Sequence, residues 1–220
     1  MLPGENSKII SISKEILASL PMATYNGQIV LVDSEDGAHN AAQELRKHRI
    51  IGFDTETKPS FKRGQTHHVA LLQLSAGTNC YLVRLNRIGL PDEIKEILED
   101  ENITKIGLSI HDDFHNLNRL FSIEPAEFID LQAYVKQFKI IDNSLARIYG
   151  ILFGKRISKS QRLSNWEAEQ LTPAQQAYAA LDASACVEIY EYLDSGKFDY
   201  LSSPYLQEPV NLNEQEEANQ

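Results

Sequence analysis

The chain has 220 residues, enough for one ample domain or two small ones, and its 42% hydrophobic and 24% charged content is ordinary for a globular protein. The formal net charge of −10 argues against a basic protein that coats nucleic acid, but not against an enzyme whose acids bind metal ions. No apolar run approaches membrane-spanning length and no signal-peptide pattern follows Met1, so we expect a cytoplasmic protein. Cys80 and Cys186 lack metal-ligand spacing and are expected to be buried thiols.

Apolar periodicity and helix-breaking residues predict an alternation of strands and helices. In chain order they are a helix over 13–20, a strand over 28–32, a helix over 34–49, strands over 50–56, 68–74 and 80–85, a helix over 91–98, a strand over 103–109, a helix over 112–121, a strand over 128–131, helices through 134–148 and a helix from 172. The order predicts a three-layer α/β domain with a mixed β-sheet. We expect an N-terminal extension over 1–27, the domain over 28–200 and an acidic, disordered tail over 201–220.

Asp54 and Glu56 end the apolar run 50–56, which has the length and branched content of a buried strand. Residues i and i+2 of a strand point to the same side, so the two carboxylates would project together. Two anions beside a core are costly unless a cation neutralises them, and hard oxygen ligands suit Mg²⁺ or Mn²⁺. The alternative is a strand that ends in a solvated loop.

Asp112 and Asp113 follow the next strand of the same kind, at the start of a predicted helix. Asp113 lies at helical spacing from the apolar Leu117 and Leu120, so we expect it to face the sheet and the other acids. Asp112 lies in line with Asn116, faces solvent and is free to act as the N-cap, a position that aspartate favours.

Tyr178 and Asp182 belong to a well-signalled helix. Thr172 and Gln175 have capping-box spacing, and Pro173 occupies the first helical position. Tyr178 and Asp182 are four residues apart and therefore share a face. The pair is either part of a site or a tyrosine hydroxyl beside a surface aspartate.

Together these motifs resemble those of the DnaQ-like (DEDD) 3′–5′ exonucleases, in the DEDDy subclass and in the branch of ribonuclease D and the Werner-helicase exonuclease domain. The resemblance covers residues 28–193. It rests on Asp54-Thr55-Glu56 with the trailing Pro59-Ser60-Phe61, on Ala70-Leu71-Leu72-Gln73-Leu74, on Asp113, on Lys159, Ser164, Asn165, Trp166 and Leu171, and on Tyr178 and Asp182.

The resemblance implies a ribonuclease H-like fold and a hydrolase that removes nucleoside 5′-monophosphates from the 3′ end of DNA or RNA. It implies two divalent cations, Mg²⁺ or Mn²⁺, with Asp54 bridging both, Glu56 and Asp182 completing one site and Asp113 holding the other. Tyr178 would orient or help deprotonate the attacking water. Nucleic acid is the implied partner. We expect a monomer without membrane contact, and the sequence names no protein partner.

Substrate contacts are expected from two basic stretches that could hold phosphates or could be solvated loops. The first contains Lys155, Arg156, Lys159 and Arg162, and the second Lys58, Lys62, Arg63, His67 and His68. Trp166 either stacks on a base or belongs to the core, and Phe61 is placed beside the terminal nucleotide by resemblance alone. The competing function is a nuclease-fold module that has lost catalysis and only binds nucleic acid or a protein.

Overall fold

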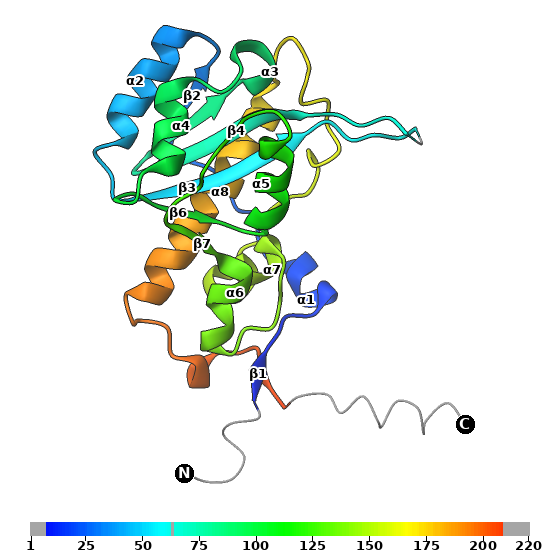
Figure 1. Cartoon of the computed structure of the whole chain (residues 1–220). Coiled ribbons are helices and arrows are strands. Elements are labelled where there is room, and N and C mark those ends of the chain that lie inside the picture. Colours follow the sequence, from blue (N-terminus) through cyan, green and yellow to red (C-terminus); the bar gives the residue numbers. More distant parts are fainter. Residues whose placement is uncertain (1–7, 63, 209–220) are drawn as a thin grey trace.

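The computed structural model describes residues 8–62 and 64–208, and its centre is a six-stranded mixed sheet with the strand order β2-β5-β4-β3-β6-β7 (Figure 1). β3 pairs antiparallel with β4, and β4 with β5, whereas the outer pairings β2–β5, β3–β6 and β6–β7 are parallel. The predicted mixed α/β sheet is therefore confirmed. The strands are β2 (Gln28–Val32), β3 (Ile50–Thr57), β4 (Val69–Ala76), β5 (Asn79–Val83), β6 (Thr104–Gly107) and β7 (Phe128–Asp130).

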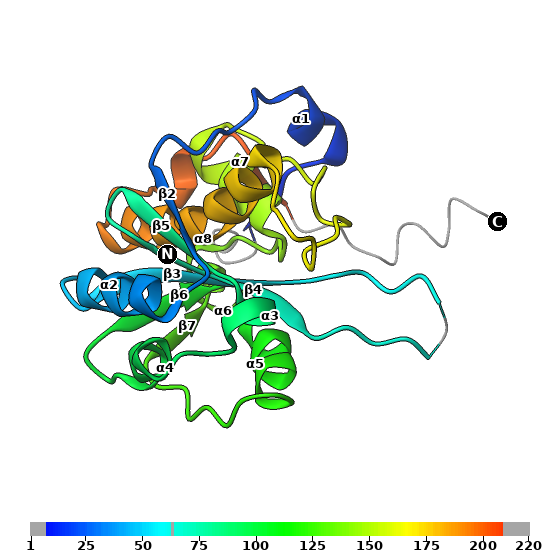
Figure 2. The same cartoon turned by 90° about the horizontal axis from the view of Figure 1, so that it is seen from above.

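Helices cover both faces of this sheet, as the view in Figure 2 shows. One face packs against α2 (Glu35–Leu45), α3 (Leu85–Ile88), α4 (Asp92–Glu99) and α5 (Ile110–Asn118), through a core that includes Ile51 and Phe53 of β3. The other face packs against α8 (Pro173–Asp194), which contacts every strand from β2 to β6. Alternation along β3 therefore directs Ile51 and Phe53 to one layer, and Gly52, Asp54 and Glu56 to the other.

Gly52 shows how closely α8 approaches the sheet. A Cβ atom at this position would lie 2.0 Å from the carbonyl oxygen of Ala183, so no larger residue fits without displacing the helix. Ala179, Ala180 and Ala183 of α8 are buried on the same face. Small residues on both surfaces thus bring the helix backbone down onto β3, two residues before Asp54.

A second core lies beside the sheet and joins both ends of the described chain. It contains Ile10 and Ile12, which precede α1 (Lys14–Ser19), together with residues of α6 (Leu131–Tyr134), η1 (Val135–Phe138), α7 (Leu145–Phe153) and the second half of α8. The predicted N-terminal extension is thus packed into the domain over its described part, and Ser13 caps α1 as expected, since its side chain accepts a hydrogen bond from the Ile16 amide.

The predicted tail needs a correction, because part of it is folded. η2 (Tyr200–Ser202) is followed by β8 (Leu206–Gln207), which pairs antiparallel with β1 (Ile9–Ile10). Two apolar residues, Tyr205 and Leu206, are half-buried against the second core, which explains why this segment is ordered despite its polar composition. Residues 209–220 lie outside the described part. Within that part, no helix is long and apolar enough to cross a membrane.

Candidate active site

Three carboxylates converge where β3 meets α8. Asp54 and Glu56 point from β3 toward the helix, and Asp182 points back from it; one oxygen of each lies within 4.8 Å of the others. Glu56 and Asp182 are buried and Asp54 is half-buried. Gly52 lets α8 approach β3 closely, and this brings Asp182 near Asp54 and Glu56. The distance between the carboxylates therefore depends on small residues that are not part of the cluster.

Asp113 of α5 is the fourth predicted acid and lies next to this group, outside the three-carboxylate cluster. The Thr55 hydroxyl donates a hydrogen bond to its Oδ1 atom, and its charge raises the pKa of both Asp54 and Glu56. The expected apolar stripe behind it is only partly correct: Leu117 is buried, but Leu120 is exposed because α5 ends at Asn118.

Asp112 does not cap α5, and this prediction was wrong. The helix begins two residues earlier than expected, at Ile110, and its N-cap is Ser109 in the left-handed conformation. The Asp130 carboxylate, at the end of β7, accepts hydrogen bonds from the backbone amides of Ser109 and Ile110 at 3.1 and 3.2 Å. Asp130 therefore binds the amides at the start of α5, the role expected of Asp112. No local sequence pattern indicates this, because Asp130 lies about 20 residues further along the chain.

Burial raises the pKa of all four acids, and neighbouring carboxylates add to the effect at Asp54, Glu56 and Asp113. Burial, with the charges of Asp182 and Asp113, raises the pKa of Glu56 to about 9. Burial likewise raises the pKa of Asp113 and of Asp182 to about 7, against the hydrogen bonds from Thr55 and Tyr178 respectively. Burial and the neighbouring carboxylates hold the pKa of Asp54 well above its ordinary value.

Tyr178 lies one helical turn before Asp182, half-buried, with its hydroxyl directed at that carboxylate. Burial raises the pKa of the hydroxyl far above its ordinary value, and the charges of Asp182 and Glu56 add to the effect. The side chain therefore stays protonated at neutral pH and acts as a hydrogen-bond donor. The ring packs near Trp166, with 6.1 Å between centroids.

Trp166 itself is completely buried, in a cluster with Leu71, Leu82 and Ala180. The core interpretation is confirmed, and the expectation that Trp166 contacts substrate is wrong, since no part of the ring is open to a base. Its role here is to fill the space beneath Tyr178.

The predicted basic residues divide into free and engaged groups. Lys159 and Arg162 are exposed, and their charges lower the proton affinity of Asp182 and Glu56 respectively. By contrast, the Nε atom of Arg156 donates a hydrogen bond to the Leu20 carbonyl at 3.1 Å, which ties it to the N-terminal segment. Lys155 is exposed, and nothing in the structure assigns it to the site.

The second basic stretch lies on the β3–β4 connection, which projects from the body of the molecule (Figure 1). Phe61, 80% exposed, is on this connection, together with exposed Lys62 and His68; Arg63 lies outside the described residues. Lys58 and His67, at its two bases, both bind Glu167, at 3.2 and 2.8 Å. No local motif indicated this pairing, which partly neutralises the charges of two residues expected to contact phosphates.

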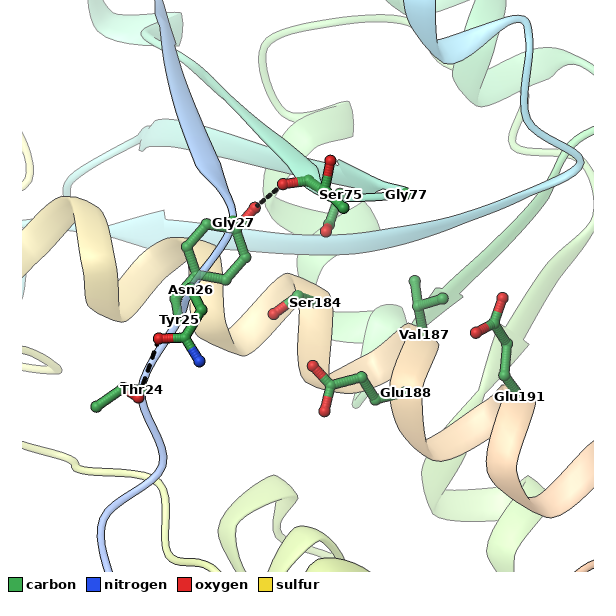
Figure 3. Close-up of a pocket in the computed structure, with 11 residues that line it drawn as sticks. Thr24, Tyr25, Asn26, Gly27, Ser75, Gly77, Ser184, Val187, Glu188 and Glu191 are labelled. Carbon is green, nitrogen blue, oxygen red and sulfur yellow. Dashed lines mark hydrogen bonds between the residues drawn. The ribbon is translucent and has the colours of Figure 1, made fainter.

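The hollow drawn in Figure 3 is separate from the acids. It measures about 320 Å³ and lies against a later part of α8, between Tyr25, Ser75 and Ser184. Its carboxylate Glu188 accepts a hydrogen bond from the Tyr149 hydroxyl at 2.7 Å. None of the four acids lines it.

The acidic cluster fits divalent metal binding on its own chemistry. All the donors are carboxylate oxygens, the type that hard cations prefer. The Oδ1 atom of Asp182 is buried without a hydrogen-bond partner in the described part of the protein. Burial, and at Asp54 and Glu56 also the charges of neighbouring acids, keep the pKa values raised despite the nearby cations Lys159 and Arg162, so additional positive charge would stabilise the ionised group.

Comparison with known proteins identifies the family of this chain. A family model described as 3′–5′ exonuclease matches residues 29–196. The bifunctional 3′–5′ exonuclease/ATP-dependent helicase WRN of Mus musculus is 31% identical over 193 residues, which cover 83% of this chain and 14% of that protein. Ribonuclease D of Escherichia coli superposes with a TM-score of 0.68 at 26% identity, over 77% of this chain and 44% of that one.

The Trypanosoma brucei ribonuclease D, in complex with RNA U12, superposes with a TM-score of 0.66 at 19% identity, over 86% of this chain and 66% of that one, and so supports the fold. The fold and the site together define a ribonuclease H-like nuclease domain. The chain belongs to the 3′–5′ exonuclease family, as the resemblance predicted. It spans only 14% to 27% of the length of the first three curated relatives that it matches.

Proposed function

We propose that this protein is a metal-dependent 3′–5′ exonuclease that releases nucleoside 5′-monophosphates from DNA or RNA. The observation that carries the proposal is the convergence of Asp54, Glu56 and Asp182 within 4.8 Å, with Asp113 beside them and Tyr178 directed at the same point. An ordinary surface does not hold four acids with raised pKa values in one place, and such groups mark functional sites.

The four acids are the proposed ligands of two divalent cations, Mg²⁺ or Mn²⁺. Asp54 belongs to the three-carboxylate cluster and its pKa is raised by the charges of Asp182, Asp113 and Glu56, so it is the candidate for the ligand shared by both ions. Two such ions, when bound, supply charge that stabilises the attacking and leaving oxygens of a phosphodiester.

Tyr178 is proposed to orient the attacking water. Its hydroxyl remains protonated, so it can donate one hydrogen bond and accept another, which fixes a water molecule without removing its proton. The half-buried position beside Trp166 limits the ring to a narrow range of orientations. Positioning is thus the role that the environment of Tyr178 supports.

The proposed substrate is a nucleic-acid strand that enters with its 3′ end. Lys159 and Arg162 carry free positive charge next to the acids, as a phosphate contact requires, and Phe61 presents an exposed ring on the projecting connection. A relative of the same fold binds RNA. Both DNA and RNA are included in the proposal, and we retain a monomer and a cytoplasmic location as predictions.

The test is release of labelled nucleotide from matched single-stranded DNA and RNA oligonucleotides carrying a 3′-terminal label. We expect monophosphate release in Mg²⁺ or Mn²⁺, none in excess EDTA, and none from Asp54→Asn. Folded, Mn²⁺-binding protein that cleaves neither substrate would contradict the proposal and favour the binding module. Cleavage that persists in EDTA would contradict the role of the acids.

A further inference from the structure

Gln73, in the middle of β4, is a polar side chain at a buried position where an apolar residue would be expected. It is completely buried, and neither Oε1 nor Nε2 has a hydrogen-bond partner within the described residues. Leaving a buried polar atom without a partner is energetically costly, and most buried polar groups in proteins are paired. A residue that leaves two such atoms unpaired needs an explanation beyond packing.

The explanation lies in its neighbour across the sheet. Gln73 is in register with Asp54 on β3 and with Leu82 on β5. Directly opposed residues of an antiparallel pair point to the same face, with Cβ atoms about 4.5–5.5 Å apart. Leu82 offers no polar group, so Asp54 is the polar cross-strand neighbour of Gln73, on the face that carries the acidic cluster.

The surroundings restrict what else Gln73 could contact. Leu71 and Leu82 are apolar, and the part of α8 packed on this face presents Ala179 and Ala183. Trp166 is in the same cluster with its Nε1 atom buried and unpaired, but an indole N–H only donates, so it could serve the Gln73 Oε1 atom and leaves Nε2 in need of an acceptor. The Oδ1 atom of Asp182, also buried and unpaired, belongs to the same cluster as Asp54. Asp54 thus has two neighbours with unpaired buried atoms, Gln73 across the sheet and Asp182 on α8.

We propose that Gln73 is a positioning residue for Asp54. Its Nε2 group donates a hydrogen bond to the Asp54 carboxylate when that group is ionised and bound to a divalent cation, directly or through one buried water. This bond fixes the carboxylate orientation. Gln73 does not touch substrate, and the inference rests on the proposed function, since it assigns Asp54 to metal binding. Groups that orient metal ligands in this way commonly change affinity or activity by about 10–100-fold.

The variant Gln73→Met tests this because methionine has nearly the same length and volume but no amide. The measurements are the Mn²⁺ dissociation constant of EDTA-treated protein by titration calorimetry, its Tm without metal, and kcat and KM on an oligonucleotide. We expect Mn²⁺ affinity and kcat to fall by about 10–100-fold with KM unchanged. The Tm without metal should not fall, because an unpaired polar group has been replaced by an apolar one.

Leu71→Met is the matched control. Leu71 is on the same strand and face, equally buried, and opposite Glu56, so its variant changes packing without changing hydrogen bonding. We expect wild-type Mn²⁺ affinity. Should Gln73→Met not fold, Gln73→Leu, which also lacks the amide, must show the same loss.

Wild-type Mn²⁺ affinity and kcat in either folded Gln73 variant would overturn the inference, and so would equal losses in Leu71→Met. Wild-type protein that binds Mn²⁺ but cleaves nothing contradicts only the proposed function, because the affinity comparison still tests Gln73. Wild-type protein that binds no Mn²⁺ contradicts both.

Discussion

Ser109 takes a left-handed backbone conformation, with φ of 63°, at the turn from β6 into α5. Such a conformation is uncommon for a residue with a side chain. Here the Asp130 carboxylate stabilises this conformation by accepting hydrogen bonds from the backbone amides of Ser109 and Ile110. The turn sets the first residue of α5 and therefore decides that Asp113 faces the acids while Asp112 faces solvent.

This register predicts opposite results for two neighbouring substitutions. Asp113→Asn should reduce single-turnover cleavage by more than the roughly 100-fold typical of groups one step away from a metal. The fold should persist, since an amide oxygen can still accept the Thr55 hydrogen bond. Asp112→Asn, whose side chain is 83% exposed, should retain activity. An inactive Asp112→Asn beside an active Asp113→Asn would reverse the assignment.

Tyr178→Phe should lower kcat by about 10²–10⁴-fold with little change in KM, because the hydroxyl is lost and the ring still packs near Trp166. Pre-steady-state cleavage with Mg²⁺, and oligonucleotide binding in Ca²⁺, separate the two effects. A variant that cleaves as fast as wild type would remove the tyrosine from the proposed chemistry.

Individual site residues were predictable where a motif is local. Asp54 and Glu56 were expected on one face because they are two residues apart in a strand, and Tyr178 and Asp182 because they are four residues apart in a helix. Contacts between distant residues were not predictable: Asp130 is 21 residues from Ser109, and the partners of Glu167 are 100 and 109 residues away. Such pairs form only after the sheet has brought separate loops together.

At the scale of elements, α8 organises the site because it carries both Tyr178 and Asp182 and buries one side of β3. Its start was predicted correctly, since the Thr172 hydroxyl accepts the Gln175 amide at 3.2 Å and the Gln175 side chain accepts the Thr172 amide at 3.0 Å. Its 22 residues, by contrast, show almost no amphipathic pattern, because strands lie beneath it and further core residues surround its second half.

Thr172→Ala should therefore destabilise the protein by about 0.5–2 kcal/mol in urea unfolding, and it should also reduce cleavage, because a frayed start loosens the turn before Tyr178. Ser34→Ala, which removes the corresponding cap of α2, is the control. It should cost similar stability without affecting activity, as α2 carries no site residue. Equal effects of both variants on activity would show that global stability alone matters.

Strand order illustrates what sequence patterns could and could not establish. The hairpin between β4 and β5 follows from the turn residues Gly77 and Thr78, and the alternation of later strands and helices indicated the mixed sheet. The pairing of β1 with β8 was not predicted, because each strand has only two residues and neither shows periodicity. Strands of two residues are recognised only by their hydrogen-bonded partner strand, which the sequence pattern does not indicate.

For the whole molecule, the raised pKa values imply that stability without metal depends on pH. In the folded state Glu56, Asp113 and Asp182 keep their protons to a higher pH than in the unfolded chain, where such groups lose them at about pH 4. The contribution of these three groups to the free energy of unfolding is therefore fully present below about pH 4. It is lost as the pH rises through about 7 for Asp113 and Asp182 and toward about 9 for Glu56.

We expect the Tm of EDTA-treated protein to fall between about pH 5 and pH 9, and saturating Mn²⁺ to remove most of this slope by neutralising the ionised acids. Differential scanning calorimetry at several pH values measures both. Glu56→Gln, which cannot ionise, should show a shallower slope without metal. A Tm that rises over this range in EDTA would contradict the electrostatic description of the cluster.

The pairing of β1 with β8 also determines how the fold responds to mechanical force. Ile9 pairs with Gln207 and Ile10 with Leu206, so tension applied through the ends reaches one pair before the other and peels the strands apart bond by bond. β8 should detach first, because Ile10 is also held by hydrogen bonds with Lys139 and Ile141. In optical tweezers we expect an early step at low force, ahead of rupture of the sheet; a single rupture would show that the terminal strands resist as firmly as the core.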